Sequence, residues 1–140
     1  MGAFESRQTT AQLRRLQLLL LVMIVWDVLA VIAALSFGSP LAEIDDDRIG
    51  GILAARVGFS GAVLVPIVMY LYALARNPLR HRGVIWAGVV EQGAAALFAV
   101  YHVAVKDINV EGTIVPLVVA VVLLIGLLIN MPRAYAQVAP

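Results

Sequence analysis

Four apolar stretches, at residues 16–37, 52–75, 84–105 and 113–131, fill most of this 140-residue chain. Each is close to the roughly 20 residues that an α-helix needs to cross a hydrocarbon layer of about 30 Å. Hydrophobic residues make up 62% of the chain and charged residues 14%, whereas soluble domains average about half apolar and about a quarter charged. We therefore predict an all-α integral membrane protein with one domain over residues 1–140.

The connections between these stretches are short and polar, so consecutive helices should be antiparallel neighbours in a four-helix bundle. Lys and Arg residues predict the sidedness, because they are enriched in cytoplasmic loops. Seven of them lie in the two tails and the second connection: Arg7, Arg14, Arg15, Arg76, Arg80, Arg82 and Arg133. Two, Arg48 and Lys106, lie in the other connections. Both termini are expected to be cytoplasmic in a multi-pass protein of the cell membrane.

The first stretch could also be read as a secretory signal, because Arg14 and Arg15 precede it and Ala34-Leu35-Ser36 resembles a cleavage site. The apolar core of a signal is about 7–15 residues long, which is shorter than this stretch. We expect a helix that is retained in the mature protein.

Three ionisable residues, Asp27, Arg56 and Glu91, lie inside the apolar stretches, and His102 lies near the end of the third. Charges are costly in lipid, so these side chains should face protein or water and are candidates for a functional site. Asp27 and Arg56 are expected to form an ion pair that fixes helix register, with the binding of an anion by Arg56 as the alternative. Glu91 is expected to form a hydrogen bond to a neighbouring helix as a neutral acid. The alternative is a role in proton coupling or ligand binding.

The face of the third helix follows from its period of 100° per residue, which places Glu91 and His102 only about 20° apart. The small residues Ala94, Ala95 and Ala99 and the side chain of Phe98 share this face, which is expected to point into the bundle. Aromatic residues near helix ends are expected to anchor the chain at the membrane interface; these are Tyr70, Tyr72, Trp86 and Tyr101.

No pattern in the sequence indicates a catalytic site, a metal site or a bound cofactor. The chain has no cysteine, and it lacks a glycine-rich phosphate loop and metal-ligand spacing. The acidic run 45–47 is expected to be a solvated loop, with a cation site as the alternative. Haem ligation by His102 lacks a second histidine, because His81 lies in the opposite connection. A net charge of +1 without a basic tract gives no reason to expect nucleic acid.

Three segments carry a family resemblance: Ala55-Arg56-Val57-Gly58, the basic Pro-containing turn at 76–82, and the apolar-glycine segment at 84–88. Through them the chain resembles the small four-helix membrane proteins grouped as DoxX-like or BphX-like. The resemblance implies four helices, cytoplasmic termini and a role for Arg56, and it implies no reaction.

The sequence favours a non-enzymatic accessory or structural subunit, which is embedded in the lipid bilayer and bound to a membrane-protein partner or to copies of itself. The alternative is a small proton-coupled transporter or ligand-binding protein that uses Asp27, Arg56 and Glu91. A third reading is a redox subunit that holds quinone or haem near His102.

Overall fold

The computed structural model describes residues 2–36, 46–105 and 110–132, and all of its regular elements in these ranges are helices. The four α-helices are α1 (Gly2–Ser36), α2 (Asp46–Ala75), α3 (Arg82–Val105) and α4 (Val110–Ile129). A short 3-10 turn, η2 (Pro78–Arg80), joins α2 to α3. The prediction of an all-helical chain with four long helices is therefore confirmed for the described residues.

All four helices begin earlier than the apolar pattern predicted, and α1 and α2 differ the most. α1 begins at Gly2 rather than at residue 16, and α2 begins at Asp46 rather than at residue 52. The expectation of a loop across the acidic run is thus wrong for Asp46 and Asp47. Carboxylates are stabilising near the positive end of the helix dipole, and the glycine pair Gly50-Gly51 weakens a helix without ending it. Asp45 lies outside the described residues.

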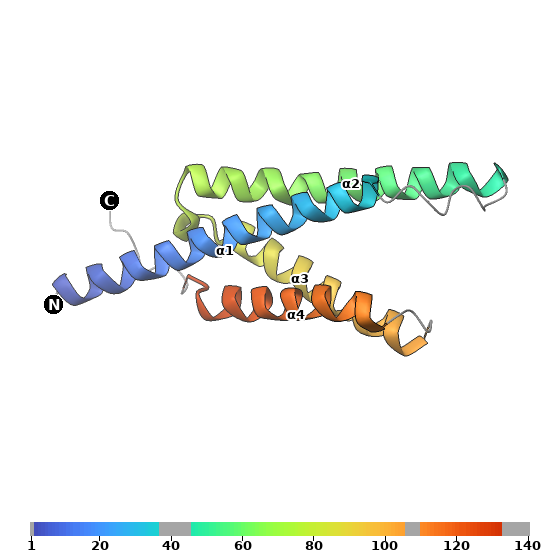
Figure 1. Ribbon diagram of the computed structural model, residues 1–140. Helices are drawn as coiled ribbons and strands as arrows, with labels where there is room; N and C mark the ends of the chain where they lie inside the picture. The colour runs from blue at the N-terminus through green and yellow to red at the C-terminus, as the bar shows by residue number, and fades with distance from the viewer. Residues whose placement is uncertain (1, 37–45, 106–109, 133–140) are drawn as a thin grey trace.

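The helices form two antiparallel pairs, α1 with α2 and α3 with α4 (Figure 1). The pairs meet near the end that carries η2 and diverge toward the other end (Figure 1). Contacts within each pair are extensive, whereas contacts between α1 and α4 and between α2 and α3 are few. Gly126 on α4 marks one contact between the pairs, since a Cβ there would lie 2.8 Å from the Leu19 side chain of α1.

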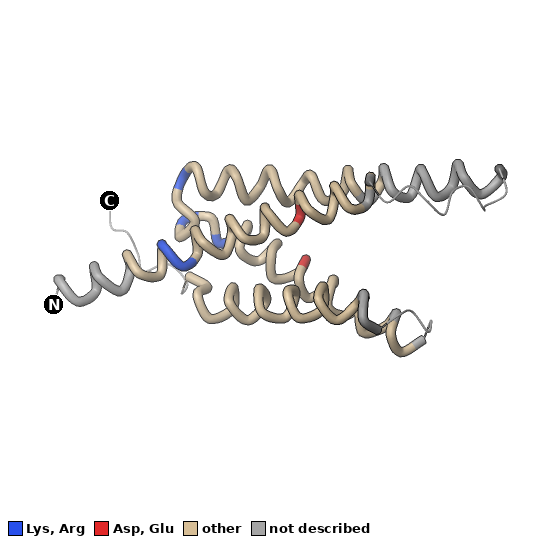
Figure 2. The backbone as a smooth tube through the Cα atoms, in the orientation of Figure 1, with Lys and Arg blue, Asp and Glu red and all other residues tan. Residues whose placement is uncertain are grey.

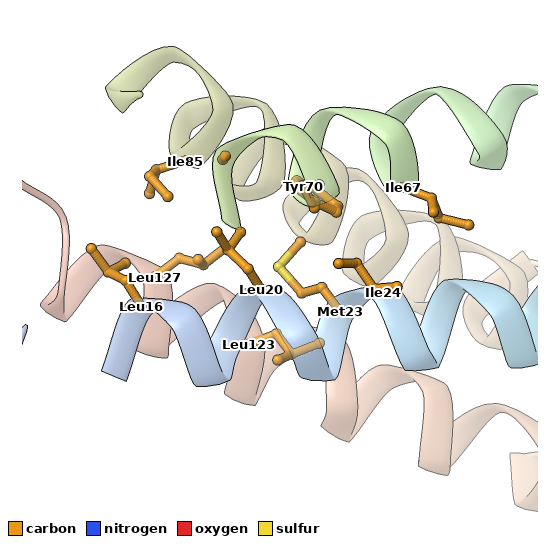
Figure 3. Close-up of a cluster of buried hydrophobic side chains, with 10 residues drawn as sticks. Leu16, Leu20, Met23, Ile24, Ile67, Tyr70, Ile85, Leu123 and Leu127 are labelled. Atoms are coloured by element: carbon orange, nitrogen blue, oxygen red, sulfur yellow. The ribbon is translucent and has the colours of Figure 1, made fainter. Parts of the chain in front are cut away.

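The buried core lies where the two pairs meet, and all four helices contribute to it (Figure 3). On α1, Leu16, Leu20 and Met23 repeat at helical spacing and are fully buried. They pack with buried side chains from α2, α3 and α4, among them Ile67, Tyr70, Ile85, Leu123 and Leu127.

The outward faces of the helices are apolar over most of their described length. Two described segments are long and apolar enough to cross a membrane, Thr10–Ala33 and Arg82–Tyr101. Two further apolar segments are shorter, Ser60–Ala75 and Thr113–Ile129. Large exposed side chains occur on every helix, for example Leu18, Val25, Val65, Leu71, Val90, Leu97, Val118 and Val122.

The end at which the pairs meet is also the basic end of the molecule. Figure 2 colours Lys and Arg in α1 and around the turn between α2 and α3, and it colours Asp and Glu in the middle of α1 and of α3. Gln12 on α1 donates a hydrogen bond to the carbonyl oxygen of Asn130 at 3.0 Å. This bond brings the first part of α1 and the end of α4 to the same end.

Candidate functional site

A group of polar side chains lies in the apolar middle of the molecule, and we name Asp27, Tyr70, Glu91 and Gln92 the polar cluster. Asp27 on α1 is 4% exposed, Gln92 on α3 is 2% exposed, and Tyr70 on α2 is fully buried. Glu91 on α3 is half-buried. Three helices thus contribute to one polar site, which the apolar core surrounds.

The hydroxyl of Tyr70 donates a hydrogen bond to Oε2 of Glu91 and so links α2 to α3. Asp27 lies within electrostatic range of Glu91, and Tyr70 interacts with both carboxyl groups. Figure 2 shows the two acidic positions on α1 and α3, in the region between the helix pairs. The cluster therefore combines two carboxyl groups of like charge with one hydroxyl donor.

Gly88 sets the register of the cluster. A Cβ at this position would lie 3.0 Å from Cε of Met23 and 3.3 Å from the Tyr70 hydroxyl, so α1, α2 and α3 approach one another closely here. The helices α1 and α3 run in the same direction (Figure 1). Asp27 and Gln92 each lie four residues beyond this contact, so they share a level about 6 Å further along the two helices.

Two oxygen atoms of the cluster are buried acceptors without a hydrogen-bond partner in the described part of the chain: Oδ2 of Asp27 and Oε1 of Gln92. Buried polar atoms are normally paired, because leaving one unpaired costs about 1–3 kcal/mol. Both atoms accept hydrogen bonds, so a hydrogen-bond donor or a cation is the kind of ligand that would satisfy them.

The structure places Asp27 and Glu91 within electrostatic range of each other. The side chains of Arg56 and His102 lie outside the described part of the chain. The ion pair between Asp27 and Arg56, and every role of His102, therefore stay predictions. The structure shows a hydrogen bond between Glu91 and Tyr70 of the neighbouring helix α2, whereas the neutral state of the Glu91 carboxyl group stays a prediction.

The structure corrects the expectation for Tyr70. A position near the end of an apolar stretch suggested an interfacial anchor, yet Tyr70 is fully buried and its hydroxyl bonds to Glu91. The helical period of α2 could have predicted the burial of Tyr70, because Tyr70 shares a face with Ser60, Val63 and Ile67. Ser60 and Ile67 on that face are buried as well.

The inward face of α3 also differs from the prediction. Ala94 and Ala95 are exposed, and Phe98 is 66% exposed, although all three were expected to face inward. The buried positions are Ile85, Gly88, Gln92 and Ala99, which repeat at spacings of three, four and seven residues. The face is therefore centred on Gln92, which the sequence reasoning missed because it followed the charged Glu91.

Within the described ranges, no group of three or more His, Asp and Glu side chains could hold a metal ion. Comparisons of the chain with protein-family models, curated proteins and solved structures gave no match. The resemblance to DoxX-like and BphX-like proteins therefore stays a prediction, and the function must be argued from the geometry of this chain.

Proposed function

We propose that this chain is a small integral membrane protein whose four helices cross the bilayer as an antiparallel bundle. The apolar outward surface is the observation that carries the proposal. In each of the two long apolar segments, 22% of the most apolar 18-residue stretch is buried. The core helix of a soluble protein is mostly buried. Water is a poor solvent for so much exposed Leu, Val and Ile, and lipid is a good one.

The basic end supports an orientation with this end in the cytoplasm. Arg14, Arg15, Arg76 and Arg80 are exposed near it, and short basic loops are retained on the cytoplasmic side. The start of α1 and the end of α4 meet at the same end through Gln12 and Asn130. Both termini are therefore proposed to be cytoplasmic.

Single-cysteine labelling tests this topology, because the natural chain has no cysteine to remove. Arg80→Cys in the turn between α2 and α3 should react with a membrane-impermeant maleimide only after the cytoplasmic face is opened. Asp45→Cys in the first connection should react in intact cells and serves as the opposite-side control. Labelling of Arg80→Cys in intact cells, or of both positions on the same side, contradicts the proposed topology.

Within the membrane, we assign the chain the role of a non-enzymatic accessory subunit or self-associating structural protein. The described helices leave their outer apolar faces without a protein partner in a single copy, and the short connections leave no soluble domain for chemistry. Purification in mild detergent, followed by mass spectrometry of the intact assembly, should find the chain with a membrane-protein partner or with copies of itself. A bare monomer under these conditions contradicts this role.

The polar cluster favours a second candidate function, a small proton-coupled transporter or ligand-binding protein. Two carboxyl groups and two unpartnered acceptors in an apolar interior are typical of proton and substrate pathways in membranes. Glu91→Gln keeps the size of the side chain and removes its charge. In proteoliposomes, a pH-dependent flux that Glu91→Gln abolishes and Glu91→Asp, which keeps the carboxyl group, does not would favour transport. An unchanged assembly without any flux in either variant favours the accessory role.

A further inference from the structure

We propose that the turn between α2 and α3 is a binding site for the phosphate group of an anionic phospholipid. The inference rests on the proposed function, since it needs this end of the molecule to lie at the membrane surface. The site consists of Arg76, Arg80, His81 and Arg82, which we name the basic turn.

The basic turn is held in a defined shape by its own contacts. The side-chain oxygen of Asn77 accepts a hydrogen bond from the backbone N–H of Leu79 at 3.0 Å, which caps η2. The ring of His81 stacks on Tyr72 with centroids 5.1 Å apart. The guanidinium of Arg76 lies 5.6 Å from the centroid of the same tyrosine ring. These contacts hold the side chains of Arg76 and His81 before a ligand arrives, which reduces the entropy that these two residues lose on binding.

The basic turn presents donors and positive charge that are not neutralised within the described part of the chain. No ion pair involves its arginines there, and the described acids Asp27 and Glu91 lie in the middle of their helices (Figure 2). Glu91 is nine residues, about 13 Å, from Arg82 along α3. Nε of Arg82 and Nε2 of His81 have no hydrogen-bond partner in the described part of the chain, but both atoms are buried. The exposed side chain of Arg80 is therefore the group that a phosphate meets first. Guanidinium groups match phosphate oxygens in geometry as well as in charge.

The start of α3 adds backbone donors beside these side chains. α3 begins at Arg82, and the first N–H groups of a helix attract anions. The N–H groups of Val84 and Ile85 donate to the carbonyl oxygen of His81, which leaves those of Arg82 and Gly83 for an anion. Gly83 is exposed, and a Cβ there would meet nothing within 4 Å. A phosphate group can therefore approach this helix end closely. A lipid is the favoured source, because the exposed apolar side chains of α3 continue directly below the turn and would lie along its acyl chains.

Fluorescence quenching can test the site, because Trp86 lies one turn below Arg82 and is 45% exposed. In a Trp26→Phe background, the chain is reconstituted into phosphatidylcholine vesicles. A minor fraction of the lipid, either phosphatidylglycerol or phosphatidylcholine, carries bromine on its acyl chains. We expect brominated phosphatidylglycerol to reach Trp86 with an about fivefold preference, the factor equivalent to one basic residue at an anionic surface.

A matched pair of variants separates a site from general surface charge. Arg80→Gln/Arg82→Gln should lose the preference, whereas Arg14→Gln/Arg15→Gln removes the same charge from α1 at the same end and should keep it. Far-UV circular dichroism confirms that each variant is folded. Equal losses in both variants, or no preference in the parent chain, overturn the proposal.

Two further outcomes show whether the bound phosphate belongs to a lipid and whether α3 lies in the bilayer. If inorganic phosphate abolishes the preference at constant ionic strength and at a concentration below that of the accessible phosphatidylglycerol, free phosphate is the better ligand and the lipid assignment is wrong. If neither brominated lipid quenches Trp86, the helix is not in the bilayer and the proposed membrane function fails with it. Quenching by both lipids without preference overturns the lipid site alone.

Discussion

At the scale of single residues, burial depends on the face of the helix rather than on the charge of the residue. Gln92 and Tyr70 are more completely buried than Glu91, although Glu91 has the costliest group to place in an apolar interior. Glu91 remains half-buried because it lies beside the buried stripe of α3, and the Tyr70 hydroxyl compensates for part of its lost hydration.

The hydrogen bond between Tyr70 and Glu91 yields a direct prediction. Tyr70→Phe should lower the free energy of unfolding by about 1 kcal/mol, because side-chain hydrogen bonds between membrane helices contribute about that much. Reversible unfolding in mixed micelles measures the change. Tyr72→Phe is the matched control, since Tyr72 is 53% exposed and should lose little. Equal losses in the two variants would show that the bond is not formed.

At the scale of the helices, close approach is decided by where small residues meet large neighbours. On α3, a Cβ at Gly88 would meet Cε of Met23 at 3.0 Å and Cδ1 of Leu127 at 3.1 Å. Gly93 lies on the same helix, and a Cβ there would meet nothing within 4 Å. The two glycines are chemically identical, and only the packing of α1 and α4 distinguishes them.

This difference predicts unequal effects of one substitution on α3. Gly88→Ala should leave the protein less stable than Gly93→Ala by about 1 kcal/mol, because the side-chain ends of Met23 and Leu127 must shift to make room for the new Cβ. Gly93→Ala should be neutral or stabilising by up to about 1 kcal/mol, because alanine is the better helix former and meets no neighbour. Chemical unfolding of the two variants in the same micelle provides the comparison. The reverse order would mean that the helices do not approach at Gly88.

At the scale of the whole molecule, two helix pairs meet at the basic end and diverge from it (Figure 1). A monomer with this shape keeps much of its apolar surface outside the core. The exposed side chains of all four helices therefore need lipid or protein around them, which is the physical basis of the proposed membrane location.

Membrane extraction follows from this surface. The chain should remain in the membrane pellet after an alkaline carbonate wash, which releases peripheral proteins, and it should be released by detergent. Immunoblotting of pellet and supernatant measures the distribution, with a peripheral protein of the same membrane as the control. A folded, monodisperse chain in the alkaline supernatant is incompatible with four spanning helices.

The sequence by itself determined the helical class and the number of long helices. Both follow from the length and spacing of the apolar stretches, which are local properties of the chain. The first residues of the helices could not be predicted in this way, because a polar first turn such as that of α2 contains too few apolar residues to show the helical period.

Only the tertiary structure decided which residues meet across helices. The bond between Tyr70 and Glu91, the burial of Gln92 and the crowding at Gly88 each depend on the rotation and register of a neighbouring helix. The sequence of one apolar stretch does not predict how the neighbouring helix is aligned with it, because many rotations of a helix about its axis bury similar apolar area. Packing against the other helices selects one of them, and that selection creates the polar cluster.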